Sequence, residues 1–399
     1  MLAAAAVSLS ACATSTDYGT RAVGDRPMEL NTTEASMWYQ MDEAEADLQT
    51  SGRLVEDARL NAYVDDLVCR IAGEFCSDIR VYVVDNPGFN AMMAPNGMMV
   101  INTGLLLRAD SEDELGFVIG HELVHYIENH ALEQRAATRN ANITAAVLSS
   151  VVSIGIAAGT GTMMGQGYSG SGGSIAAALA YGGAFSYSRE REAEADAMGL
   201  EMAIEQGLDP KAGARIWSNL LAELEASDDN RRADRAERSG LFRTHPIIRD
   251  RIDALESQAA DYPDVEPRVE AYDAVIAPFI GDWLDAQIGM RDNGSSLYLI
   301  DRGLEAGRHP GIFQAARARV LVQRGEEGDA EAAMDAYRAA IAYEDAPADA
   351  FRDYGDLLRR QGENAEAAQA FTTYLQRAPQ ARDARLVERY IENLMGETE

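Results

Sequence analysis

The sequence contains few cysteines, histidines and basic residues, and each shortage narrows the possible class of protein. Three cysteines in 399 residues are too few for a scaffold built on disulfides. Lys and Arg total 35 against 65 Asp and Glu, and this net charge of −30 argues against a nucleic-acid-binding protein, because phosphates would be repelled. With only five histidines, their positions become informative. The 47% hydrophobic and 25% charged content is that of a folded protein, and the length allows two to three domains of roughly 150 residues.

Long apolar runs are also scarce. A membrane-spanning helix needs about 20 apolar residues. The best candidate, residues 143–158, is shorter and contains Ser149, Ser150 and Ser153. We therefore expect a buried or cleft-covering helix there, followed by a flexible glycine-rich loop over residues 159–174.

The first residues are small and apolar and end in Leu9-Ser10-Ala11-Cys12. This resembles a bacterial lipoprotein signal, in which the cysteine is lipidated after cleavage; the alternative is an ordinary ragged terminus. The resemblance implies a signal over residues 1–12, a lipid anchor on Cys12 and a polar tether over residues 13–33. Because Ala13 rather than Asp follows the cysteine, it also implies anchoring to the outer membrane of a Gram-negative bacterium, on the periplasmic side.

Two cysteines remain in the body of the chain, Cys69 and Cys76. In an oxidising compartment they are candidates for a disulfide. Two reduced, partly buried thiols are the alternative, because the sequence fixes no geometry.

The first two thirds of the chain alternate helical and extended patterns. Three β-rich segments separated by Asn/Pro/Gly turns predict a small sheet between helical regions, which is an α+β fold. The expected strands are residues 79–84, 89–93 and 98–101, and the expected helices are residues 33–72, 111–139, 187–206 and 211–226. Ser111 is the expected N-cap of the second helix.

The last third has a repeating helical character. Residues 328–337 align with residues 362–371 at an offset of 34, which is the tetratricopeptide period. A chance similarity within a plain helical bundle is the alternative. A segment with two prolines and three acids, residues 261–267, marks the expected boundary between the two parts.

The chemical signal is His121-Glu122-Leu123-Val124-His125, an H-E-x-x-H pattern. On a helix, residues i and i+4 share one face, so both imidazoles can bind one metal ion while Glu122 lies within reach of a bound water. A catalytic zinc needs a third protein ligand and one open position. Glu192 and Asp196 are again four residues apart; the first can bind the metal, and the second can accept a hydrogen bond from the outer nitrogen of a ligating histidine.

H-E-x-x-H followed by Ser188-Arg189-x-x-Glu192-x-x-Ala195-Asp196 resembles the HtpX and CAAX-prenyl-protease family of gluzincin metallopeptidases. The resemblance covers about residues 42–255 and extends to the Thr244-His245-Pro246 segment with Arg251. It implies one Zn²⁺ per chain, held by His121, His125 and Glu192. With an export signal and a tetratricopeptide-type tail, the nearest subgroup resembles the periplasmic BepA-type proteases.

The resemblance also implies the domain limits and the catalytic roles. We expect a zinc metallopeptidase domain over residues 34–258 and a helical repeat domain over residues 268–399. Glu122 is the expected general base. His245 and Arg251 are candidates for oxyanion stabilisation; His245 alternatively caps the zinc or is a structural turn histidine. His130 and His309 are interpreted as structural or surface residues.

Three hypotheses of function follow from these residues. The first is an envelope endopeptidase that degrades misfolded or misassembled outer-membrane proteins, binding extended chains along an edge strand at Asn90, Ala91 and Met92, with the repeats recruiting clients or the outer-membrane assembly machinery. The second is a largely latent protease acting as chaperone or adaptor through its repeats. The third, a membrane CAAX-type protease, is disfavoured because several spanning helices are lacking.

Overall fold

The computed structural model describes residues 18–27, 29, 32–140, 187–228, 245 and 249–396. The expected signal with Cys12, the apolar stretch 143–158 and the glycine-rich segment 159–174 lie outside these residues. Among the described residues, no helix combines the length and apolar composition needed to cross a membrane.

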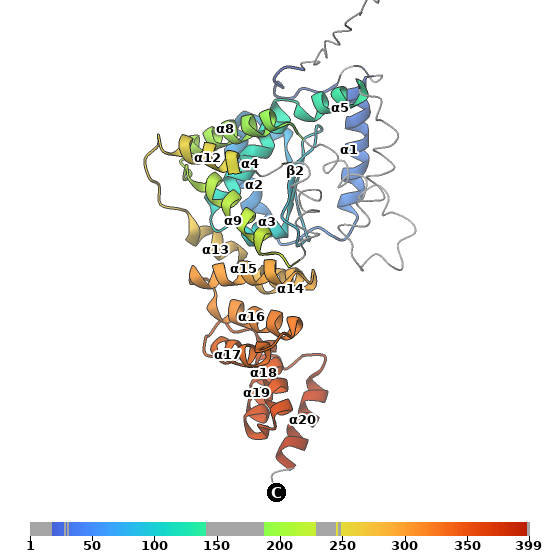
Figure 1. The fold of residues 1–399 in the computed structure, drawn as a ribbon. Coiled ribbons are helices and arrows are strands. Elements are labelled where there is room, and N and C mark those ends of the chain that lie inside the picture. The colour runs from blue at the N-terminus through green and yellow to red at the C-terminus, as the bar shows by residue number, and fades with distance from the viewer. Residues whose placement is uncertain are drawn as a thin grey trace, which may run out of the picture.

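A three-stranded sheet lies at the centre of the N-terminal body (Figure 1). The strand order is β1 (Arg80–Val84), β3 (Met98–Asn102), β2 (Ala91–Met93); β3 pairs in parallel with β1 and antiparallel with β2. Side chains alternate between the two faces, as the two-residue period of a strand requires. The α+β prediction is confirmed.

Helices cover both faces of the sheet. Met92, Met98 and Val100 pack against α1 (Thr33–Gln49) on one face. Met93, Met99 and Ile101 face the main core on the other, which α2 (Ala58–Ala72) and α4 (Glu112–Ile127) help to form. The other helices in the described part of the body are α3 (Thr103–Arg108), α5 (His130–Asn140), α8 (Arg189–Glu205), α9 (Ala212–Ala226) and α12 (Arg249–Ala259).

Two helices expected to be continuous are interrupted. The expected helix 33–72 breaks after Gln49, because Leu54 forms a β-bridge with Val84 and the neighbouring backbone bonds to β1. The expected helix 111–139 breaks at Asn129, which has a φ of 53°. Its start is as predicted, since the Ser111 hydroxyl accepts a hydrogen bond from the Glu114 N–H at 3.3 Å.

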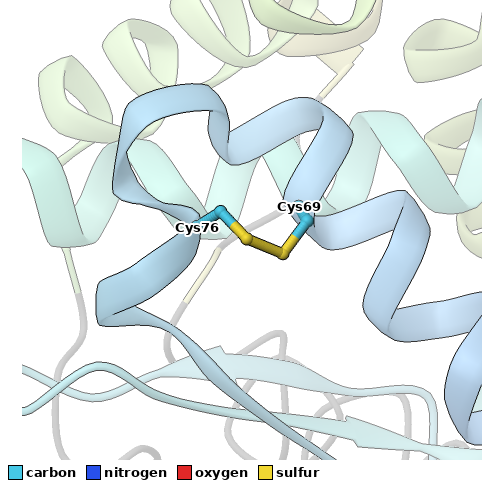
Figure 2. The surroundings of a disulfide bond; sticks show 2 residues. All are labelled: Cys69 and Cys76. Atoms are coloured by element: carbon cyan, nitrogen blue, oxygen red, sulfur yellow. A yellow bond between two sulfur atoms is a disulfide. The ribbon is translucent and has the colours of Figure 1, made fainter.

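Cys69, near the end of α2, is joined by a disulfide to Cys76 in the short 3-10 helix η1 (Gly73–Asp78), as Figure 2 shows. Of the two alternatives that the sequence leaves open, the structure has the bonded one. The bond connects α2 to the segment that leads into β1.

The C-terminal third is a column of helices extending from the body (Figure 1). In chain order these are α13 (Val269–Ile276), the 3-10 helix η2 (Ala277–Phe279), α14 (Ile280–Gly289), α15 (Asn293–Glu305), α16 (Pro310–Arg324), α17 (Asp329–Ala340), α18 (Ala348–Gln361), α19 (Asn364–Arg377) and α20 (Ala384–Gly396). Tyr337 and Phe371, equivalent in the 34-residue alignment, are both fully buried. The apolar core of the body continues across the linker as far as Val320 in α16, and a second core occupies the rest of the column.

Candidate metal centre

The centre forms where α4 and α8 cross at close range (Figure 1). Gly120 and Gly199 face each other at the crossing. A Cβ atom on Gly199 would lie 2.6 Å from the backbone nitrogen of His121, so only glycine permits this approach. The crossing brings the H-E-x-x-H face of α4 against the start of α8.

Three candidate ligand side chains converge there, those of His121, His125 and Glu192. The Nε2 atoms of His121 and His125 are 3.2 Å apart, and the two carboxylate oxygens of Glu192 each lie 3.6 Å from one of them. All three side chains are buried. Ligands bound at 2.0–2.1 Å to a tetrahedral zinc ion are about 3.3–3.4 Å apart. The donor types and spacings therefore fit a zinc-like divalent ion.

His245 is a fourth member of this cluster. Its Nδ1 atom lies 3.2 Å from His121 Nε2 and 2.9 Å from Glu192 Oε1, and one ligand atom from each of the four residues falls within 4.8 Å of the others. Burial opposes charge on His245, but the carboxylates of Glu192 and Glu122 outweigh it and raise its pKa. His245 thus lies among the three candidate ligands.

A polar group orients His121 from outside. Asp196 Oδ1 lies 3.0 Å from His121 Nδ1. Arg251 donates to both oxygens of Asp196 at 2.6 and 2.7 Å and also lies 2.7 Å from Glu192 Oε2, while the Trp217 indole N–H donates to Asp196 at 3.2 Å. Despite burial, Arg251 and His121 lower the pKa of Asp196 to about 2. Arg251 therefore lies behind the ligands, paired with two carboxylates.

Glu122 lies beside the donor set and is only 2% exposed. Burial raises the pKa of its carboxyl group, while the charges of His245 and His121 and a backbone hydrogen bond from Met93 act in the opposite direction. Met93 is in β2, which pairs only with β3 among the described residues. The edge strand expected at Asn90, Ala91 and Met92 thus adjoins Glu122, and Ala91 and Met92 are buried in this structure.

The structure also places His130 here, which sequence reasoning interpreted as structural or surface. Its ring is 1% exposed and its Nδ1 atom lies 2.8 Å from His125 Nδ1. Burial, followed by the charge of Arg191, lowers its pKa to about 4. Tyr187, at the other side, stacks on His125 with ring centroids 4.0 Å apart. In the sequence, only the closeness of His130 to His125 could have indicated this contact. In a continuous helix, however, a residue five positions later lies on a different face, so the contact was not predicted.

The chain is similar to several known proteases. A putative beta-barrel assembly-enhancing protease of Vibrio cholerae is 27% identical over 257 residues, covering 60% of this chain and 49% of that protein. The beta-barrel assembly-enhancing protease of Escherichia coli K12 is 28% identical over 129 residues (30% of this chain, 26% of that protein). Human mitochondrial metalloendopeptidase OMA1 is 33% identical over 113 residues (26% and 20%). The chain thus matches about half of the first relative's length and less of the others.

The profile of Peptidase family M48 matches residues 55–259, just over half of the chain. That span contains both crossing helices, the three converging donors and Glu122. This chain therefore belongs to peptidase family M48.

Proposed function

We propose that the protein is a zinc-dependent endopeptidase of the bacterial cell envelope. The observation that carries the proposal is the convergence of His121 Nε2, His125 Nε2 and the Glu192 carboxylate beside a buried Glu122. Two imidazoles and one carboxylate, with one open position, are the ligand set of catalytic zinc in many proteases. One Zn²⁺ per chain is the expected content.

A zinc ion held there would polarise the scissile carbonyl and make a nearby water more acidic. Glu122 takes the proton from the attacking water and delivers it to the leaving amine. Burial raises the pKa of its carboxyl group, which makes the carboxylate a stronger base. Asp196 holds the His121 ring, and Arg251 holds Asp196 and Glu192. These pairings favour a positioning role for Arg251 over the oxyanion role.

For His245 we propose that it occupies the open ligand position and keeps the enzyme latent. Its 3.2 Å and 2.9 Å distances to His121 and Glu192 support this role. His245→Ala is then expected to raise proteolysis. A further loss of activity would instead assign His245 to catalysis.

The proposed substrates are unfolded or misassembled envelope proteins. An edge strand next to Glu122 suits an extended chain, because main-chain pairing gives little sequence specificity. The relatives named beta-barrel assembly-enhancing protease support outer-membrane proteins as clients, with the tetratricopeptide-type repeats contacting the assembly machinery. A lipid anchor at Cys12 on the periplasmic side of the outer membrane completes the proposal.

Cleavage of unfolded casein by the purified protein tests this function. Because His245 is proposed to hold the enzyme latent, we expect weak zinc-dependent cleavage that rises in His245→Ala. In both proteins a chelator abolishes the cleavage and zinc restores it. Glu122→Gln is expected to lower the rate by about 10²–10⁴-fold while zinc stays bound. Glu190→Gln, the same change at an exposed position of α8, is the control and keeps full activity. Zinc-independent cleavage, or full activity of Glu122→Gln, would contradict the proposal.

A second candidate function is a latent-protease chaperone or adaptor. The observation that favours it is that His245 lies within the ligand cluster, where it would occupy the position that a catalytic water needs. Outer-membrane protein assembly in cells carrying Glu122→Gln separates the two. Unchanged assembly supports the chaperone, whereas defective assembly supports the peptidase.

A further inference from the structure

The break between α4 and α5 brings a second histidine against a metal-ligand candidate. Asn129 adopts a left-handed φ of 53°, and α5 begins at His130. The ring of His130 thereby faces the outer edge of His125, with the two Nδ1 atoms 2.8 Å apart. His130 is 1% exposed, so no bulk water competes for this contact.

The N-terminal segment holds this break in place. The guanidinium of Arg21 donates to the Asn129 side chain at 2.5 Å and to the Tyr126 carbonyl at 3.2 Å, and the Asn129 amide donates to the Gly19 carbonyl at 2.9 Å. Arg21 is itself only 4% exposed. The N-terminal segment therefore fixes the backbone that leads into His130.

The other nitrogen of His130 has a partner on the second helix of the centre. His130 Nε2 lies 3.3 Å from Glu194 Oε2, two residues beyond Glu192 in α8. The Glu194 side chain is about half exposed. A connected path thus runs from His125 through His130 to a carboxylate at the surface.

Proton placement along this path has one consistent solution. A neutral imidazole that offers Nε2 to a metal carries its proton on Nδ1, so His125 must donate to His130. His130 Nδ1 then accepts, its proton lies on Nε2, and Glu194 accepts that proton's hydrogen bond. Two nitrogens facing each other at 2.8 Å cannot both donate.

We propose that His130 is a positioning residue that sets the tautomer and ring orientation of His125, and that Glu194 sets those of His130. This inference rests on the proposed zinc site. The two imidazoles thus have different partners. Asp196, paired with Arg251, orients His121, whereas His130, paired with Glu194, orients His125. Outer partners of this kind usually change metal affinity by about 10–100-fold when removed.

Zinc affinity of the full-length protein, measured by competition with a chromogenic chelator, tests the proposal. His130→Phe keeps the ring volume and removes the acceptor, and we expect about 10–100-fold weaker zinc binding. His130→Asn keeps an acceptor oxygen near the place of Nδ1, and we expect most of the affinity to return. If His130 only filled space, His130→Asn would lower the zinc affinity more than His130→Phe, because the smaller Asn side chain leaves a larger cavity.

Glu194→Ala keeps the test decisive if His130→Phe does not fold. We expect its zinc affinity to fall about threefold or more. Glu201→Ala, at an exposed position of the same helix, is the control and keeps the wild-type zinc affinity. Wild-type affinity in folded His130→Phe, or in Glu194→Ala when His130→Phe does not fold, would overturn the inference. Failure of the wild type to bind zinc would instead overturn the proposed function.

Discussion

The catalytic body and the helical column differ in what they bury. In the body, the centre of the α4/α8 crossing contains charged and polar side chains that are almost fully enclosed, among them His121, Glu122, Glu192 and Arg251. Beyond residue 310, Asp329 is the one buried polar or charged residue within the described part of the column. Burying charge costs free energy unless every group is paired. The body therefore depends on exact pairing, and the column depends on apolar packing.

Removing the buried guanidinium of Arg251 is expected to cause the largest loss of stability. Arg251→Met leaves the buried carboxylates of Asp196 and Glu192 without their guanidinium. We expect a loss of about 3–5 kcal/mol in the free energy of unfolding, measured by urea denaturation in the presence of a chelator. A loss below about 1 kcal/mol would show that the body tolerates unpaired charge, and the contrast with the column would fail.

The next largest effect is expected where α4 and α8 cross. Gly199→Ala places a Cβ against the backbone of His121, which cannot move aside without separating α4 and α8. We expect the free energy of unfolding to fall by about 1–3 kcal/mol and zinc binding to be lost. Gly289→Ala, at an exposed position in α14 with nothing within 4 Å, is the control and changes neither. Normal zinc binding by folded Gly199→Ala would refute the proposed importance of the crossing.

An equivalent change in the column tests whether packing there stays separate from catalysis. A Cβ on Gly355 in α18 would lie 2.9 Å from the ring of Phe371, a side chain that can shift. We expect a loss of about 1 kcal/mol, seen as a lower melting temperature, with unchanged casein cleavage at 25 °C. Reduced cleavage by the folded variant would couple the column to the metal centre.

The smallest effect is expected at the surface of the column. Arg338 pairs with Asp335 at 2.6 Å, and both side chains are more than 60% exposed. Arg338→Met, the same substitution as at position 251, should leave the free energy of unfolding unchanged within the error of the measurement, because an exposed ion pair contributes little. A change comparable to that of Arg251→Met would remove the distinction between the two regions.

The features of the metal centre that depend on local spacing could be predicted from the sequence. The i and i+4 relations bring His121 with His125, and Glu192 with Asp196, onto single helical faces before any tertiary structure is known. That Glu192 and His245 meet them came from the family resemblance, because no local rule joins segments so distant. The three strands were also predicted from local signals: β1 is rich in β-branched residues, and turns delimit β2 and β3.

The features that the sequence did not predict depend on tertiary contacts. The place of His130 requires a left-handed Asn129, which Arg21 holds from more than 100 residues away. The pairing of Arg251 with two carboxylates requires α12 to pack beside α8. The interruption after Gln49 follows from bonding to β1, which outweighs the helical preference of that segment.

Metal content per chain tests the central claim most directly. After incubation with zinc and removal of the unbound ion, we predict about one zinc per wild-type chain. Glu192→Ala is predicted to retain less, because the site then loses its one anionic ligand and keeps only imidazoles. A folded wild-type protein without zinc, or undiminished zinc content in Glu192→Ala, would contradict the account.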